Sequence, residues 1–238
     1  DTISAVEAIL FDLDGTLLPM NMEEFLRQYF KAITKKFSDI VPPAEMKESI
    51  LFATAAMIRD NRPDKTNQEV FMEHFLPRIN RPAGVLMPIF DYFYTHEFKE
   101  LKSFTRPDPV AGEVVKKLSG YGYRLVLATN PIFPKEAIME RMRWAGVESI
   151  PWELVTSYEE SHYCKPNPCY YNEILTKIGL PGNRALMVGN DTTADLTAST
   201  LGIKTYLVTD NLIDRGNSPW QPDYRGKLNE LPGLLGKE

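Results

Sequence analysis

The sequence lacks several features that would place it outside the ordinary globular proteins. Its 238 residues contain no run of 18 apolar residues, so no membrane-spanning helix and no membrane partner are expected. The net charge is −5 and no basic block occurs, which argues against nucleic acid as a partner. Its two cysteines, Cys164 and Cys169, form neither a CxxC motif nor a disulfide framework. The sequence therefore predicts a reduced, cytoplasmic protein.

Histidine clusters, internal repeats and low-complexity tracts are also missing. The three histidines are scattered and match no metal-binding pattern. The content of 43% hydrophobic and 25% charged residues is typical of a globular chain. The length suits one large domain or a core domain that carries an insertion.

The segment that carries most information is an apolar run that ends in two aspartates. Residues 9–11 (Ile-Leu-Phe) predict a strand buried on both faces, and Asp12 and Asp14 follow it directly. Side chains two residues apart in a strand point the same way, so these carboxylates are expected to converge. Gly15 permits a tight turn that Thr16 can hold by a local hydrogen bond. Paired carboxylates repel unless one is protonated or a cation lies between them, and oxygen ligands suit Mg²⁺.

Beyond residue 105 the pattern alternates between strand and helix. This alternation predicts an α/β fold with a Rossmann-like parallel sheet. Asp108-Pro109 and Asn167-Pro168 each combine a helix N-cap with a proline at the first helical position. Strands are expected at 124–128, 154–156, 185–188 and 205–208, a helix at 194–201, and a last strand and helix within 223–235.

Residues 20–105 contain helical periodicity and no good strand. Apolar residues recur at three- and four-residue intervals from Phe25 to Phe37, and Thr66 and Glu69 form a capping-box pattern. Pro82 and Pro88 are expected to interrupt the following segment. We therefore predict a catalytic core formed by residues 1–19 and 106–238, with a helical cap of residues 20–105 inserted after the first strand.

Polar residues recur where the predicted strands end. Thr129 and Asn130 follow one strand, Asp191 and Asp195 follow another, and Lys165 precedes a helix. Parallel sheets bind ligands beyond the carboxyl ends of their strands, so these side chains are expected to meet the two aspartates of the first strand there.

This ordered set of four motifs resembles the haloacid dehalogenase-like superfamily, in its phosphatase branch with a helical cap. The resemblance implies that Asp12 attacks phosphorus to form an aspartyl-phosphate, and that Asp14 serves as general acid and then general base. It also implies that Thr129, Asn130 and Lys165 bind the phosphoryl oxygens.

The resemblance further implies an Mg²⁺ ion held by the Asp12 carboxylate, the Asp14 backbone carbonyl and Asp191. The fourth motif is the segment 189–195. Many relatives have Gly-Asp there, whereas Asn190 follows Gly189 in this chain. Either Asp191 is the direct ligand, which we favour, or Asn190 occupies the first acidic place. If Asp191 is the direct ligand, Asp195 would position the neighbouring groups or compensate the dipole of a helix.

These expectations predict an Mg²⁺-dependent phosphatase that hydrolyses a small phosphorylated metabolite. A phosphomutase or other phosphotransferase would use the same aspartyl-phosphate, so the sequence does not separate it from a phosphatase. A dehalogenase is less favoured, because that chemistry has no use for a leaving-group acid at Asp14. A catalytically idle binding module built on the same fold is the alternative outside enzyme chemistry.

Overall fold

A single parallel sheet organises the chain. The computed structural model describes residues 2–236 and contains six strands in the order β3-β2-β1-β4-β5-β6. Every neighbouring pair is parallel, which confirms the predicted α/β fold with a Rossmann-like sheet. The strands are β1 (Ala8–Phe11), β2 (Arg124–Leu127), β3 (Leu154–Val155), β4 (Ala185–Gly189), β5 (Lys204–Val208) and β6 (Tyr224–Gly226).

The first strand lies between β2 and β4 and is buried along its whole length. A strand covered on both faces needs apolar side chains at every position, and the four residues of β1 are all apolar. Phe11, the last of them, is in register with Leu127 of β2 and Val188 of β4. The segments that leave these three strands therefore start side by side.

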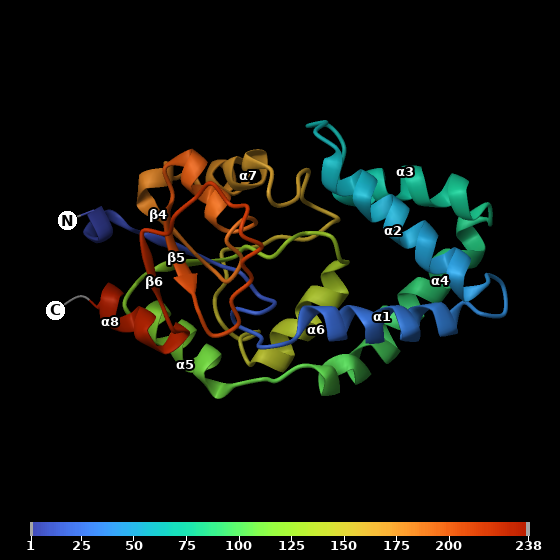
Figure 1. The fold of residues 1–238 in the computed structure, drawn as a ribbon, viewed down its shortest axis with the longest axis horizontal. Coiled ribbons are helices and arrows are strands. Elements are labelled where there is room, and N and C mark those ends of the chain that lie inside the picture. The colour runs from blue at the N-terminus through green and yellow to red at the C-terminus, as the bar shows by residue number, and fades with distance from the viewer. Residues whose placement is uncertain (1, 237–238) are drawn as a thin grey trace.

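Helices cover both faces of the sheet (Figure 1). Ile9 and Phe11 share one hydrophobic cluster with α5 (Pro109–Gly120), α6 (Lys135–Ala145) and α8 (Leu231–Leu235). Ala8 and Leu10 share the other with α7 (Pro168–Ile178) and the 3₁₀ helix η5 (Leu196–Leu201). Successive residues of a strand point to opposite faces, so the apolar run of β1 serves both clusters.

Local capping signals of the sequence are confirmed. The Asp108 side chain accepts the Val110 amide at the start of α5, and Asn167 accepts the Cys169 amide at the start of α7. Thr66 and Glu69 form the expected capping box. These local hydrogen bonds set where the helices begin, independently of the tertiary structure.

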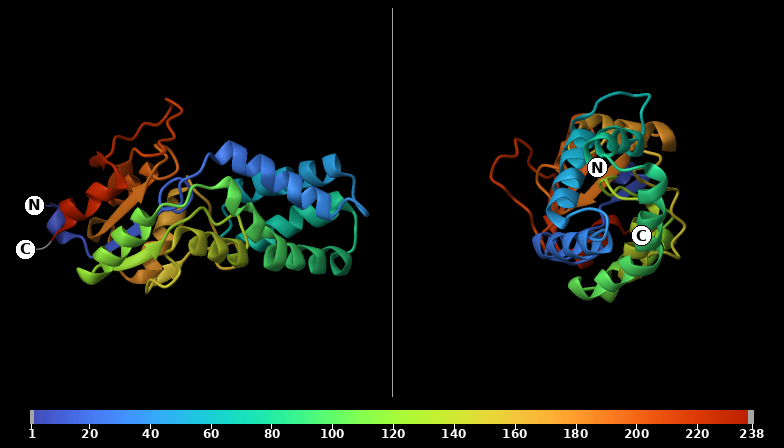
Figure 2. Two further views of the ribbon diagram at one scale, coloured as in Figure 1. Left: turned by 90° about the horizontal axis from the view of Figure 1, so that it is seen from below. Right: turned by 90° about the vertical axis from the view of Figure 1, so that its right-hand side faces the viewer.

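Residues 22–104 form helices and add no strand to the sheet. Figure 2 shows these helices at the end of the molecule opposite the two marked chain ends. Phe98 of this part stacks on Trp144 of α6 with ring centroids 5.4 Å apart. The helices are α1 (Met22–Lys36), α2 (Pro43–Arg59), α3 (Asn67–Ile79), α4 (Ala83–Tyr92), the π-helical η2 (Phe93–Glu97) and the 3₁₀ helix η3 (Phe98–Phe104).

The two segments that connect these helices to the sheet pair with each other. Met20 and Thr105 form an antiparallel bridge, and the Arg106 amide donates to the Pro19 carbonyl at 2.8 Å. Both connections therefore leave the sheet part at one place. Residues 1, 237 and 238 of the expected core lie outside the described residues.

Two local expectations are wrong. Pro88 does not break a helix but lies inside α4, whereas Pro82 lies between α3 and α4 as expected. Pro82 costs nothing before the first turn, and the burial of Leu86 and Phe90 offsets the hydrogen bond that Pro88 removes. The helix expected from residue 194 is the shorter η5, whose serine and threonines are weak helix formers.

Within residues 2–236, no helix combines the length and the apolar character that crossing a bilayer requires.

Candidate active site

The carboxyl ends of three strands bring the expected polar residues to one edge. The Asp12 amide donates to the Val188 carbonyl of β4 at 2.9 Å, and the Ala128 amide donates to the Phe11 carbonyl of β1 at 2.7 Å. Strand pairing thus continues one residue past β1 and β2. Asp12, Thr129 and Asn190 leave the sheet at this edge, where parallel sheets bind their ligands.

Lys165 lies between two carboxylates. Its Nζ is 3.0 Å from Asp12 Oδ1 and 2.7 Å from Asp195 Oδ1. All three side chains are buried. Gly189 makes this arrangement possible, because a Cβ at that position would lie 2.2 Å from Asp195 Oδ2. The three residues come from the end of β1, the segment before α7 and the turn after β4, so the ammonium ties three distant segments together.

Asp12, Lys165 and Asp195 form a buried triad. It contains two carboxylates and one ammonium group. Burial raises the pKa of Asp12 to about 7, the Asp195 carboxylate acts in the same direction, and Lys165 opposes both. Burial disfavours the Lys165 ammonium, but Asp12 and Asp195 outweigh it and hold the lysine pKa well above its usual range. The two carboxylates therefore favour the charged form of Lys165, and the Asp12 carboxyl takes up a proton more readily than a free aspartate does.

The turn after β1 packs against Asn190. Thr16 Oγ1 donates to Asp12 Oδ2 at 3.0 Å and lies 3.3 Å from Asn190 Oδ1. Asn190 Nδ2 donates to the Asn211 carbonyl at 2.8 Å, which turns Oδ1 toward Thr16. Gly15 has a φ of +82°, and a Cβ there would lie 2.3 Å from Asn190 Nδ2. The Asp12 carboxylate and the Asn190 amide oxygen therefore converge on one hydroxyl.

The Asp191 carboxylate is engaged elsewhere. Its Oδ1 accepts the amides of Thr193 and Ala194, each at 2.9 Å, and its Oδ2 accepts Arg215 Nη1 at 3.0 Å. An aspartate at a turn commonly satisfies the amides that follow it. The Asp191 carboxylate is thus held by its own turn and by Arg215. Of the two alternatives, Asn190 is the residue whose side chain shares the Thr16 hydroxyl with Asp12.

Asp14 is paired with an arginine that the sequence analysis missed. Arg141 of α6 donates from Nε to Asp14 Oδ1 at 2.9 Å and from Nη2 to Oδ2 at 3.1 Å. Arg141 is fully buried, and its guanidinium lies 4.7 Å above the ring of Phe133. A bidentate pair of this kind fixes the direction as well as the position of a carboxylate.

Thr129 and Asn130 are placed by hydrogen bonds to neighbouring loops. The Thr129 carbonyl accepts the hydroxyls of Thr156 at 2.7 Å and Tyr170 at 2.8 Å. Asn130 Oδ1 accepts the Lys165 amide at 3.0 Å. The segment after β2 is thus bound to the segment that carries Lys165, which confirms that these two regions meet.

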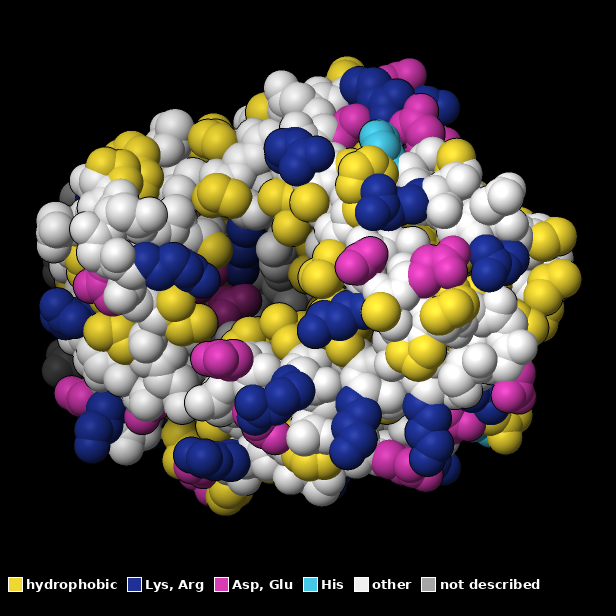
Figure 3. All heavy atoms as spheres, turned by 45° about the vertical axis from the view of Figure 1, so that its right-hand side comes forward, with side chains coloured by type: hydrophobic (Ala, Val, Ile, Leu, Met, Phe, Trp, Pro, Cys, Tyr) yellow, Lys and Arg dark blue, Asp and Glu magenta, His cyan; other side chains and the backbone are white. Residues whose placement is uncertain are grey.

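A cleft of about 650 Å³ opens beside Asp14 and Asn190. Arg106 and Arg215 also line it, and Leu26 of α1 closes part of one wall. Figure 3 shows a deep hollow between the sheet part and the helices of residues 22–104, with basic and acidic side chains in its depth. Arg106 and Arg215 are cations with which an anionic ligand can pair in a chain of net charge −5, and they lie beside the carboxylates of Asp14 and Glu23.

Comparisons with known proteins agree with this arrangement. Residues 9–208 match the sequence profile of the haloacid dehalogenase-like hydrolases. The chain belongs to that family. It is 26% identical over 211 residues to a glyceraldehyde 3-phosphate phosphatase of Methanothermobacter thermautotrophicus, covering 88% of each chain. It is 22% identical to the pyrophosphatase PpaX of Halalkalibacterium halodurans, covering 97% of this chain and 95% of that one.

A solved structure similar to this chain is that of a haloacid dehalogenase-like phosphatase from Thermococcus onnurineus. The TM-score is 0.61 at 20% identity, covering 98% of this chain and 99% of the other. At this identity the likeness shows the fold alone. The family match confirms the resemblance drawn from the four motifs, and the sequence relatives are phosphatases.

One signal in the sequence points to Arg141. The expected inner face of α6 carries Ile138, Met142 and Ala145, and Arg141 falls on that same face. A charge on an apolar face requires a buried partner, and the structure supplies it at Asp14. For the side-chain directions of Asn190 and Asp191 no comparable signal exists, because they depend on the path of the turn.

Proposed function

We propose that this haloacid dehalogenase-like hydrolase is an Mg²⁺-dependent phosphatase that hydrolyses a small phosphorylated metabolite through an aspartyl-phosphate. The observation that carries the proposal is the buried triad in which Lys165 contacts both Asp12 and Asp195, next to the Asp14–Arg141 pair. A fixed lysine beside a carboxylate nucleophile provides positive charge where the phosphoryl oxygens would lie.

The residues divide the reaction into two steps. A carboxylate oxygen of Asp12 forms a bond to phosphorus while the bond to the ester oxygen breaks, and Asp14 gives a proton to that oxygen. Water then attacks the phosphorus of the aspartyl-phosphate, Asp14 takes a proton from it, and inorganic phosphate leaves with Asp12 restored. Thr129, Asn130 and Lys165 bind the phosphoryl oxygens in both steps.

The donor set at this edge suits a hard cation. Within residues 2–236, no three Asp, Glu, His or Cys side chains gather closely enough to hold a metal alone, so main-chain or amide oxygens must contribute. The Asp12 carboxylate and Asn190 Oδ1 converge on Thr16, and all three groups are oxygen donors. We assign Mg²⁺ to Asp12, the Asp14 carbonyl and Asn190, with Asp191 as the alternative. When bound, the cation offsets repulsion between the nucleophile and the phosphate dianion.

We also propose that residues 20–105 form a cap over this edge. The paired connections at Met20 and Thr105, and the contact of Phe98 with Trp144, support one unit hinged at one place. A closed cap excludes bulk water from the first step and contributes contacts to the substrate.

The test is hydrolysis of p-nitrophenyl phosphate with Mg²⁺ and after its removal by a chelator. We expect metal-dependent release of inorganic phosphate, and loss of turnover in Asp12→Asn but not in the exposed control Asp39→Asn. Release of phosphate in step with p-nitrophenol distinguishes a phosphatase from a phosphotransferase, which would return the phosphoryl group to an acceptor. Metal-independent activity, or full activity of Asp12→Asn, would contradict the proposal.

A further inference from the structure

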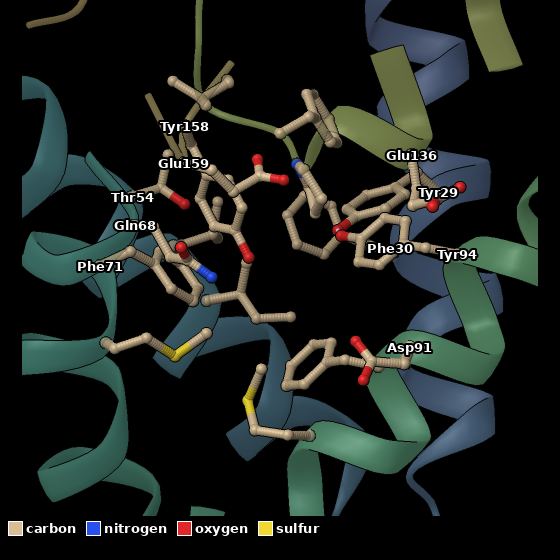
Figure 4. A pocket seen from close by; sticks show the side chains of 18 of the residues that line it. Tyr29, Phe30, Thr54, Gln68, Phe71, Asp91, Tyr94, Glu136, Tyr158 and Glu159 are labelled. Carbon is tan, nitrogen blue, oxygen red and sulfur yellow. The ribbon is translucent and has the colours of Figure 1, made fainter. Parts of the chain in front are cut away.

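A second cavity, separate from the triad, lies between the helices of residues 22–104 and the loops that follow β2 and β3. It has a volume of about 340 Å³, and we call it the aromatic pocket. Figure 4 shows Tyr158 reaching into it from one side and Tyr29 and Tyr94 facing it from the other. Its walls are mainly aromatic and aliphatic, and include Phe30, Phe71, Met87 and Phe133. A small, mostly apolar cavity with a few hydroxyls is typical of a site for an organic molecule.

The polar groups of the aromatic pocket are hydroxyls and carboxylates. Tyr29 and Tyr94 share a hydrogen bond with their oxygens 2.6 Å apart. Burial raises the pKa of Tyr29 to about 12 and also that of Tyr94, so both phenols stay neutral. The Glu159 carboxylate accepts a hydrogen bond from the Lys135 amide. Asp91 and Glu136 also line the aromatic pocket, and both are exposed. Among the described residues that line the pocket there is no lysine, arginine or histidine.

The aromatic pocket borders the catalytic cleft. Leu26 lines both cavities. Phe133, another wall of the pocket, lies beneath the Arg141 guanidinium that holds Asp14, and its ring centroid is 5.4 Å from that of Tyr29. The two cavities therefore share a wall at Leu26, and a molecule with its phosphate near Asp14 can extend its organic part toward the aromatic pocket.

The two cavities differ in the cations that they offer. The catalytic edge carries Lys165, and the cleft carries Arg106 and Arg215 beside Asp14 and Glu23, so cations that can pair with one phosphate lie on that side among carboxylates. The aromatic pocket offers rings and carboxylates, which attract cations and repel anions. A substrate with a second phosphate or a carboxylate in its organic part would have no cation to pair with there.

From these observations we infer that the substrate is a phosphate monoester whose organic part is apolar and carries a positive charge, such as an aryl or alkyl amine, bound in the aromatic pocket. The inference rests on the proposed phosphatase function. Hydrolysis breaks the bond between phosphorus and the ester oxygen, so the amine-bearing alcohol leaves intact and inorganic phosphate is the other product.

The test uses three aryl phosphates of one shape: phenyl phosphate, 4-(aminomethyl)phenyl phosphate and 4-(carboxymethyl)phenyl phosphate. We expect kcat/KM to fall in the order cationic, neutral, anionic, with about a tenfold or larger ratio between the extremes. The double variant Asp91→Asn/Glu136→Gln should move this ratio toward one. Glu48→Gln, an exposed change on α2 outside the aromatic pocket, should keep the ratio of the unmodified protein.

Calorimetry of the same three esters binding to Asp12→Asn measures the preference for the cationic ester without turnover. The same order of affinities would support the inference. Equal or tighter binding of the carboxymethyl ester, or a ratio that the double variant leaves unchanged, would overturn it. No hydrolysis of any ester by the unmodified protein would overturn the proposed function instead, while the binding order would still report on the aromatic pocket.

Discussion

Arg141 holds both carboxylate oxygens of Asp14, with Nε and Nη2 at 2.9 and 3.1 Å from them. Each oxygen of Asp14 accepts one guanidinium hydrogen bond and keeps a second lone-pair site, at which it can accept or donate a proton. Arg141 is therefore a positioning residue for the second step of the proposed reaction, in which Asp14 takes a proton from water.

Replacing Arg141 by methionine should lower kcat by about 10²-fold, in the range typical of a general base, with a smaller effect on KM. Because the second step slows most, rapid mixing with p-nitrophenyl phosphate should show a burst of p-nitrophenol. Arg141→Lys should recover part of the rate, and Arg143→Met, which removes only a surface ion pair, should change it little. A uniform loss of rate without a burst would count against a role in the second step.

The fourth motif makes a prediction about metal affinity. Asn190→Ala should raise the Mg²⁺ concentration needed for half-maximal activity more than Asp191→Ala does, because the Asn190 amide oxygen shares the Thr16 hydroxyl with Asp12, whereas the Asp191 carboxylate binds Arg215. Asn190→Asp should retain or tighten Mg²⁺ binding, since a carboxylate is the stronger ligand. A Mg²⁺ titration of activity measures each value. If Asp191→Ala had the larger effect, the ligand originally favoured from the sequence would be correct.

The raised pKa of Asp12 makes the stability of the metal-free protein depend on pH. Its pKa is about 7 in the folded chain against a usual value of 3.8, so between these values the folded protein holds a proton that the unfolded chain has lost. The free energy of unfolding should therefore fall as pH rises through this window. Urea denaturation with a chelator present should show this fall in the unmodified protein and in Asp39→Asn. Asp12→Asn should show a flatter profile.

Gly189 should tolerate no side chain. A methyl group there would meet the Asp195 carboxylate, so Gly189→Ala should cost about 1–3 kcal/mol in the free energy of unfolding and remove most activity. Gly84→Ala is the matched control, because open space surrounds that helical position, and it should stabilise the protein by about 0.5–1 kcal/mol. Equal stability of the two variants would show that Asp195 moves aside without cost.

The sequence predicted the features that depend on local or periodic signals. The strand β1, the caps at Asp108 and Asn167, and the meeting of Asp12 with Lys165 follow from apolar periodicity and from the geometry of parallel sheets. The direction of Asn190 and the partner of Asp14 do not, because each depends on segments distant in sequence. Lys165 pairs with Asp12, 153 positions away in the sequence, and with Asp195, 30 positions away. A local sequence pattern does not reach that far.

The antiparallel bridge between Met20 and Thr105 places both ends of the helical insertion next to each other. A short hairpin turn could close that gap without disturbing the register of β1 and β2. Under the proposed division into core and cap, the chain crosses between the two parts only here, while Asn67 and Phe98 add contacts elsewhere. Under that division, substitutions within residues 22–104 would change the walls of the aromatic pocket while Asp12, Asp14 and Lys165 keep their places.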